Sequence, residues 1–559
     1  MCAGGLRTEY RDGRHGPAAG VPGRAAGTIG RSRRRAAPRG RPYDPDVHRR
    51  PQTKAGEARN LTSARTRRSP SGRALLAVLV LLGSSAGLSA CGGGASGSDR
   101  VKARAGAAGV GDPYLPQAGN GGFDVLHYAL KLDCTPRVNE LRAKATVRAR
   151  AEHDLRSFHL DLRGLRVEEV RVDGERARFS RRGQELTVRP AAPIPRGDRF
   201  TTEVRYSGTP RTLTDKDGSE EGWVRTEDGA VVLGEPVGSA VWFPGNHHPG
   251  DKASYDIEVT VPKGLTAVSN GELRGRSGDP DGRTTFRWRN REPMPSYAAT
   301  VAIGDFTMKA YPIRLGKRTE GGAAPRVLRA WTAVDPATGP AGEASMRRLP
   351  EVLEWAERNF GPYPFATTGG IVERVGDASY ALETQTRPVY PGPPDVLLHV
   401  HEIAHQWFGN SVSPRSWRDM WLNEGFATYA EWLWQEDFDG ISAQESFEAV
   451  HDGSYFETAD EAVNLWKFPP ARPSGPDHLS DAPSYEGGAM VLHRVRQVVG
   501  ESTFRALLTG WPAAHRHGNA DTAQFTAYVE KLAGPGARAE LREVWKRWLY
   551  GKGKPKLPE

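Results

Sequence analysis

The sequence predicts an α+β protein of several domains, with a β-rich N-terminal domain followed by a mainly helical domain. Two observations predict this order. From Phe123 to about Met308, short runs of alternating apolar and polar residues are separated by turn signals. After Leu315, apolar residues recur at the three- and four-residue steps of amphipathic helices. We therefore expect a β domain at 112–310 and a helical domain at 311–559.

The positive charge of the chain is concentrated near its N-terminus. Residues 1–90 carry a net charge of +13, whereas the rest of the chain carries −3. The overall charge of +10 therefore gives no reason to expect nucleic-acid binding by the folded part. Residues 1–72 are rich in Arg, Gly, Pro and Ala and hold few bulky apolar residues, so we expect them to be disordered. A true translation start nearer Arg73 is an alternative explanation of this extension.

Residues 73–90 are typical of a signal peptide, because Arg73 precedes an apolar stretch that is too short for a comfortable membrane span. The stretch ends in the letters LSACG, which resemble a bacterial lipobox. That resemblance implies cleavage before Cys91 and lipidation of its thiol, with 91–111 as a flexible linker. We therefore expect an exported protein that is anchored to the lipid bilayer on the outer face of the cell membrane. A plain secretory signal with an incidental cysteine is the alternative.

The expected β domain carries clear strand and turn signals. The strand-like runs include His127–Leu132, Lys144–Ala149 and Tyr255–Val261. The turn signals between such runs include Asp173-Gly174 and Asn270-Gly271. Cys134 falls in a strand-like segment, and we expect it to be a buried residue without a disulfide partner.

The expected helical domain begins, after a short β stretch near Tyr311–Leu315, with an amphipathic helix. This helix runs from Glu343 to Phe360 and should end at Gly361, because prolines follow it. Further helices are predicted at Tyr485–Val499, Ser502–Thr509, Ala523–Leu532 and Ala539–Leu549.

The most informative motif is a pair of histidines, His401 and His405, on one predicted helix. Positions i and i+4 of a helix share a face, so the two imidazoles can bind one cation. Glu424, at the start of a second predicted helix, adds a carboxylate. Two histidines and one carboxylate leave a fourth position open, which is the ligand set of a catalytic zinc. Glu402 lies beside them and can act as a general base; an ordinary surface helix with two histidines is the alternative.

The strings HEIAHQWFGNSVSP and WLNEGFATYAEW resemble the gluzincin aminopeptidases, the family of aminopeptidase N and leukotriene hydrolase. The resemblance runs from about Gly122 to the C-terminus. It implies a saddle-like N-terminal β domain, a thermolysin-like catalytic domain and one Zn²⁺ per chain. We expect a short form of the family, without the large helical C-terminal domain of many members.

The resemblance also implies further site residues. Tyr485 matches the tyrosine that stabilises the oxyanion, although the family often has Lys where Gly487 stands; a half-buried core tyrosine is the alternative. Glu383 matches an acid that binds the α-ammonium group of the substrate, but Tyr380 and Thr384 depart from the family segment.

A second such acid, in the β domain, corresponds to Glu235, which could equally be a surface acid. Asn410 and Asp419 are candidates for contacts that orient the metal ligands, because zinc-binding histidines usually have such partners. These residues predict a zinc aminopeptidase that acts on peptide substrates. A zinc endopeptidase or other hydrolase on the same scaffold, and a catalytically silent peptide-binding lipoprotein, are the alternatives.

Overall fold

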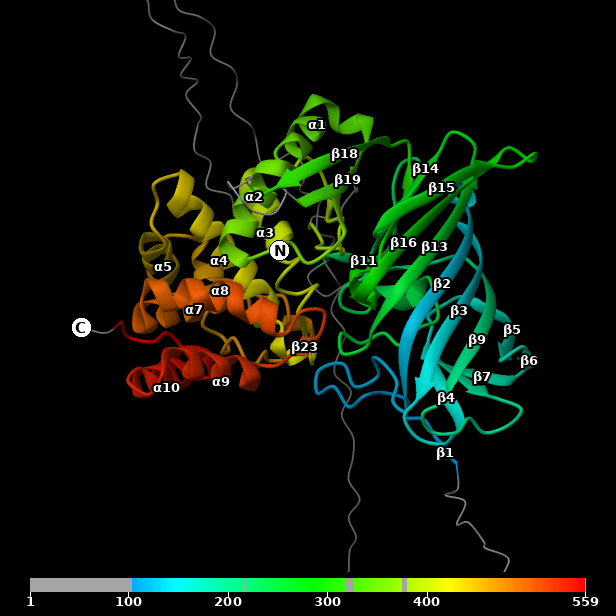
Figure 1. Cartoon of the computed structure of the whole chain (residues 1–559), viewed down its shortest axis with the longest axis horizontal. Coiled ribbons are helices and arrows are strands. Elements are labelled where there is room, and N and C mark those ends of the chain that lie inside the picture. The colour runs from blue at the N-terminus through cyan, green and yellow to red at the C-terminus, as the bar shows by residue number, and fades with distance from the viewer. Residues whose placement is uncertain (1–102, 215–217, 317–325, 375–379, 558–559) are drawn as a thin grey trace, which may run out of the picture. The chain divides into compact units, whose positions relative to one another are not determined.

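The computed structural model describes residues 103–214, 218–316, 326–374 and 380–557. The predictions for the leader, the signal peptide and Cys91 lie outside these residues. Strands dominate the first half of the described chain and helices dominate the second (Figure 1). None of the described helices is both long enough and apolar enough to cross a bilayer.

A mixed eight-stranded sheet forms the centre of the N-terminal half (Figure 1). Its strands, in spatial order, are β15 (Glu272–Gly278), β16 (Arg283–Pro295), β13 (Lys252–Pro262), β2 (Phe123–Thr135), β3 (Glu140–Ala151), β9 (Arg199–Gly208), β5 (Arg166–Val172) and β6 (Glu175–Arg176). A five-stranded sheet follows the order β10 (Thr212–Thr214), β11 (Glu220–Arg225), β12 (Ala230–Leu233), β17 (Val301–Gly304) and β14 (Thr266–Ser269). A four-stranded sheet contains β1 (Arg104–Ala105), β4 (Leu155–Asp161), β8 (Glu185–Arg189) and β7 (Arg178–Arg182).

The alternation seen in the sequence becomes the two faces of the large sheet. Along β13, buried and partly exposed side chains alternate at every position, as expected for a strand with one face on the core. In the centre of the sheet, Leu130 of β2 lies opposite Ala145 of β3 and Ile257 of β13. All three predicted runs therefore lie in strands, which extend beyond them. Cys134 is buried in β2 and has no disulfide partner among the residues that the structure describes.

The two predicted turns have different roles. Asp173 and Gly174 have φ values of 49° and 84° and join β5 to β6, which is the geometry of a tight hairpin. Asn270 and Gly271 are instead buried. The Asn270 side chain donates hydrogen bonds to the carbonyls of Ala298 (3.0 Å) and Gln385 (2.8 Å), so this segment connects the two halves of the chain.

A second four-stranded sheet lies between the β-rich and helical halves of the sequence. It consists of β18 (Thr307–Leu315), β19 (Arg326–Val334), β20 (Thr367–Val372) and β21 (Val389–Tyr390). The boundary expected between residues 310 and 311 falls inside β18. The single helix expected from Glu343 is two helices, α1 (Gly339–Arg347) and α2 (Leu349–Phe360). Pro350 explains the break, because proline has no N–H to continue the hydrogen bonding of α1 and is tolerated in the first turn of a new helix.

The remaining helices include α3 and α4, which carry the predicted metal-binding motif. They are α3 (Val396–Ala404), α4 (Trp421–Phe438), α5 (Ala443–Asp452), α6 (Ala459–Asn464), α7 (Glu486–Val499), α8 (Glu501–Ala514), α9 (Thr522–Ala533) and α10 (Arg538–Val544). A π-helical turn follows α10 at Trp545–Leu549, and the short strands β22 (Ser413–Pro414) and β23 (Asn519–Ala520) pair in parallel.

Helix α4 is the centre of the helical core. It approaches α7 so closely that a Cβ atom on Gly425 would lie 2.7 Å from the Cα of Gly488. Its Phe426 ring stacks on Phe408, just after α3, at a centroid distance of 4.2 Å. These contacts fix α3, α4 and α7, the helices that carry or adjoin the predicted site residues.

Candidate metal centre and substrate cleft

Helices α3 and α4 position the three predicted metal ligands. The Asp395 side chain caps α3 by accepting a hydrogen bond from the Leu398 amide. His405 follows the last residue of α3 but keeps helical backbone angles, so its ring still shares a face with His401. Glu424 lies in the first turn of α4.

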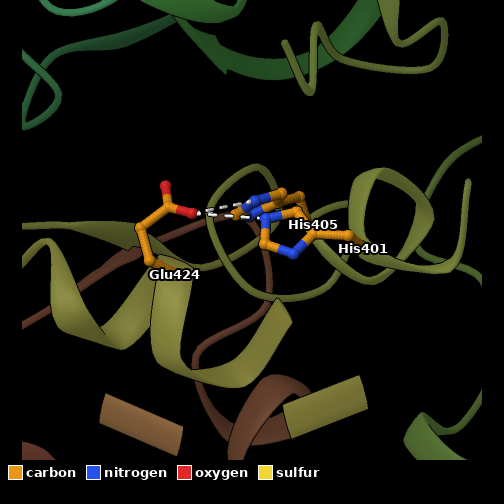
Figure 2. A group of neighbouring side chains, drawn as sticks. All are labelled: His401, His405 and Glu424. Carbon is orange, nitrogen blue, oxygen red and sulfur yellow. Dashed lines mark ion pairs between the residues drawn. The ribbon is translucent and has the colours of Figure 1, made fainter. Parts of the chain in front are cut away.

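The three side chains converge on one point. The Nε2 atoms of His401 and His405 each lie 3.4 Å from the same oxygen of Glu424, Oε2 (Figure 2). A tetrahedral zinc with bonds of about 2.0–2.1 Å would separate its donor atoms by about 3.3 Å. All three residues are buried, and Oε2 of Glu424 has no hydrogen-bond partner among the described residues. The donor set and its spacing therefore fit a zinc ion.

The second nitrogen of each imidazole is held by another group. His401 Nδ1 lies 2.6 Å from Oε1 of Glu431, and His405 Nδ1 lies 3.0 Å from the carbonyl oxygen of Phe408. With Nδ1–H donating to these acceptors, each Nε2 presents its lone pair to a metal.

The side chains of Asn410 and Asp419, which were predicted to orient the metal ligands, make other contacts, although the Asn410 amide donates to the carbonyl of His405 at 2.9 Å. Asp419 accepts hydrogen bonds from the amide (3.1 Å) and hydroxyl (2.6 Å) of Thr522, because it precedes α4 in a short turn beside α9. The Asn410 side chain donates to the carbonyl of Glu383 at 2.5 Å. Glu431 was missed, although it follows Glu424 by seven residues, which is two turns along one helix face.

Glu402 lies next to the ligands and is buried, with Oε2 unpartnered among the described atoms. Carboxylate oxygens of Glu402 and Glu383 and a ring nitrogen of His405 lie within 4.8 Å of one another. Burial raises the pKa of Glu402 to about 8, while positive charge on His401 and His405 opposes this rise and the charges of Glu383 and Glu424 add to it. A carboxyl group of this kind can both accept and release a proton near neutral pH.

A cavity of about 170 Å³ opens beside the three ligands. Both halves of the chain line it, through residues 235–237 of the β domain and residues 380–383, 476–477 and 479–481 of the helical half. Tyr485 also lines it, at the N-terminal end of α7. Its ring lies nearly parallel to that of His401, at a centroid distance of 6.0 Å.

Glu383 and Glu235 face each other in this cavity. Their carboxylates and that of Glu424 each place an oxygen within 4.8 Å of the others. Oε1 of Glu383 and Oε1 of Glu235 have no hydrogen-bond partner within the described part of the chain. Burial raises the pKa of Glu235 well above its ordinary value, with the charge of Glu383 as the next cause. The buried carboxyl group of Glu383 and the partly buried one of Glu235, each with a free acceptor, form a site that a cationic ligand would satisfy.

The departures from the family segment differ in their effect. Tyr380 lines the cavity, whereas Thr384 points away from it and donates its hydroxyl to the carbonyl of Arg387 at 2.5 Å. The replacement at Thr384 therefore shapes the loop behind Glu383, and the replacement at Tyr380 shapes the cavity wall.

Comparison with known proteins identifies both halves of the chain. Residues 125–298 match the Peptidase M1 N-terminal domain, and residues 395–548 match the Peptidase family M1 domain. Probable aminopeptidase 1 of Saccharolobus solfataricus is 25% identical over 421 residues, which cover 71% of this chain and 50% of that protein. The chain spans about half the length of this and the next two curated relatives.

Solved structures from Deinococcus radiodurans match over nearly their full length. An M1 zinc metallopeptidase from Deinococcus radiodurans is 28% identical, with a TM-score of 0.71, and the match covers 80% of this chain and 98% of that one. A mutant of the same enzyme bound to a Tyr-Ser-Ala substrate is 29% identical, also with a TM-score of 0.71, covering 81% of this chain and 99% of that one. The predicted order of a β-rich domain and a helical catalytic domain is confirmed.

Proposed function

Because this chain belongs to peptidase family M1, we propose that it is a zinc aminopeptidase that removes N-terminal residues from peptides. The proposal depends on one observation: a set of metal-binding side chains and a pair of further carboxyl groups line the same cleft. Two imidazoles and a carboxylate are spaced as zinc ligands, and two further carboxyl groups, each with a buried oxygen that has no partner among the described residues, lie beside them.

His401, His405 and Glu424 would hold one ion per chain. A zinc ion bound there would polarise the scissile carbonyl and lower the pKa of a water molecule. The partners Glu431 and Phe408 keep both imidazoles in the tautomer that this requires. Elemental analysis of the purified protein should give one zinc per chain, and His405→Ala should retain none.

Glu402 and Tyr485 are the proposed catalytic residues. Oε2 of Glu402 accepts the proton of the attacking water and then delivers it to the leaving amine. The Tyr485 hydroxyl donates a hydrogen bond to the carbonyl oxygen as negative charge develops on it. The ring of Tyr485 lies over that of His401, which supports this role.

Glu383 and Glu235 would bind the α-ammonium group of the substrate. Each charge-assisted hydrogen bond of this kind contributes roughly 1.5–3 kcal/mol. The contact also sets the register of the peptide, because an ammonium group held there leaves the first peptide bond beside the metal ligands.

The decisive experiment compares free and N-acetylated forms of the same peptides, with and without a metal chelator. We expect rapid release of the first residue from the free peptides, little cleavage of the acetylated ones, and loss of both with the chelator. Equal cleavage of both forms would instead support an endopeptidase, an alternative favoured by the departures at Tyr380 and Thr384.

We also propose that the protein is exported and anchored to the outer face of the membrane through a lipid on Cys91. The lipobox-like letters LSACG support this proposal. Mass spectrometry of the native N-terminus tests it, because an unmodified N-terminal residue downstream of Cys91 would rule out the anchor.

A further inference from the structure

The loop that carries Glu383 ends at an unusual residue, the fully buried Arg387. Its guanidinium donates to three backbone carbonyls: Nε to Trp331 (3.1 Å), Nη2 to Gly271 (2.9 Å) and Nη1 to Ser269. The guanidinium also lies 4.6 Å from the centroid of the Trp288 ring. Within the described residues, no carboxylate pairs with it.

Burying a charge without a counter-ion is costly, so a purely structural position would favour an apolar side chain. The positions of the three carbonyls that accept hydrogen bonds from Arg387 indicate that it joins separate segments of the chain. Ser269 and Gly271 belong to the β domain, at and just after the end of β14, whereas Trp331 lies in β19. A planar guanidinium with several donors can join these segments in a fixed orientation, which a lysine or a neutral side chain cannot reproduce.

The backbone beside Arg387 is strained. Thr386 has a φ of 68°, a left-handed conformation that a β-branched residue rarely adopts. Two hydrogen bonds hold it there: its amide donates to Oε1 of Gln406 (2.8 Å), and its hydroxyl oxygen accepts from the Gly271 amide (2.9 Å). Such strain persists only where surrounding contacts fix the backbone.

Neighbouring hydrogen bonds also fix the backbone of Glu383. The carbonyl of Glu383 accepts hydrogen bonds from the side chains of Gln406 (3.2 Å) and Asn410 (2.5 Å), which follow α3. Reciprocal hydrogen bonds between Thr384 and Arg387 close the loop, one from the Arg387 amide (2.9 Å) and one from the Thr384 hydroxyl (2.5 Å). A displacement of Arg387 therefore moves the backbone that carries Glu383.

We propose that Arg387 is a positioning residue, whose guanidinium fixes the loop from Glu383 to Arg387 against the β domain and so sets where the Glu383 carboxylate stands in the cleft. This inference rests on the proposed function, in which Glu383 binds the substrate ammonium. The β domain then contributes to amine recognition twice, directly through Glu235 and indirectly through the carbonyls of Ser269 and Gly271.

The test is a set of variants assayed as zinc-loaded full-length enzyme on an aminoacyl fluorogenic amide. Arg387→Lys keeps the charge but loses the fork of donors, and we expect KM to rise about tenfold while kcat changes less than about twofold. Arg387→Met, which removes the charge as well, should have the larger effect, so that lysine gives partial rescue. The matched control is Arg181→Lys, because Arg181 also donates to backbone carbonyls, those of Leu162 and Leu165, but within the β domain; it should leave KM unchanged.

A double-mutant cycle separates positioning from general damage. In a Glu383→Ala background, Arg387→Lys should change kcat/KM by less than about twofold, because the group that it positions is already absent. The same loss with and without Glu383, or a loss confined to kcat, would overturn the inference. If Glu383→Ala alone does not impair cleavage of the free-amine substrate, the proposed amine site itself fails, which is a distinguishable outcome.

A second variant keeps the test informative if the arginine substitutions do not fold, which thermal unfolding will show. Thr386→Gly relieves the strain and removes the hydroxyl that accepts from Gly271, without exposing a buried charge. We expect a stable protein with KM raised about threefold, an effect that disappears in the Glu383→Ala background. An unchanged KM in Thr386→Gly would contradict the role of this loop.

Discussion

At the scale of single residues, the chemistry of the cleft depends on which atoms are occupied by protein partners and which are left free. Both imidazoles use Nδ1 within the protein and present Nε2 to the ligand position. Glu402, Glu383 and Glu235 each keep a buried oxygen without a partner among the described atoms. The residues that carry these free atoms all line one cavity. Each of them can therefore be given its own role in metal binding, proton transfer or substrate binding.

Glu402→Gln should bind zinc normally and lose about 10²–10⁴-fold in kcat. Glutamine preserves the shape of the side chain but cannot accept a proton from water. Steady-state kinetics and elemental analysis on the same preparation check both parts. A kcat near that of the wild type would show that another group is the base.

Glu431→Gln should weaken zinc binding by about 10–100-fold, because a neutral amide holds the His401 ring less firmly than a carboxylate does. Competition with a chelator of known affinity measures the change. Glu436→Gln is the matched control on the same helix, since Glu436 pairs with Arg496 and not with a ligand. Equal affinities in the two variants would contradict the role of Glu431.

At the scale of elements, the spacing of α4 and α7 sets the distance between the carboxylate ligand and Tyr485. Gly425 and Gly488 make this spacing possible, since neither helix has a side chain at the contact. The sequence shows both glycines but not that they meet, because the pairing of helix faces is a long-range property.

Gly488→Ala should lower the free energy of unfolding by about 1–3 kcal/mol, because its Cβ would lie 2.7 Å from the Gly425 backbone. Denaturant unfolding measures the loss, and kcat should fall as α4 shifts with Glu424. Gly487→Ala is the adjacent control. Its nearest contact would be the Pro470 side chain at 3.2 Å, and the helix gains propensity, so its stability should change by less than about 1 kcal/mol.

Local patterns in the sequence were sufficient for much of the fold and for the centre of the site. The i, i+4 histidines and the alternation along β2 and β13 follow from periodicity alone, so their elements could be predicted. The break before Pro350 was missed, because the apolar pattern continues across it. The side chains of Asn410 and Asp419 contact Glu383 and Thr522 and not an imidazole, because closeness in sequence to a ligand does not fix which way a side chain points.

At the scale of the whole molecule, hydrogen bonds from side chains of the β domain fix loops of the catalytic half. Lys252 of β13 donates through Nζ to the carbonyls of Asn410 (2.8 Å), Ser411 (3.0 Å) and Gly518 (3.2 Å). Tyr297 donates its hydroxyl to the carbonyl of Gly409 at 3.1 Å. These contacts, like those of Arg387 with Ser269 and Gly271, join residues more than a hundred positions apart, and no local pattern could have predicted them.

Lys252→Met should destabilise the protein by about 2–3 kcal/mol, because it removes a charged donor and leaves carbonyl groups at the domain contact unsatisfied. The decrease in unfolding free energy should be measured with zinc bound. Lys144→Met is the surface control: Lys144 pairs with Glu203 on the exposed sheet, and its loss should cost less than about 1 kcal/mol. A similar effect of both substitutions would argue against a tight domain contact.

The small volume of the cleft has a consequence for where the protein can act. A chamber of about 170 Å³ is smaller than the 300–1,000 Å³ typical of drug-sized ligand sites, and its walls come from two domains joined by many hydrogen bonds. We therefore expect an extended, free chain end to be a better substrate than a chain end packed in a folded protein. Unfolding a protein substrate should therefore increase the rate at which its first residue is released, which amino-acid analysis of native and denatured substrate would measure.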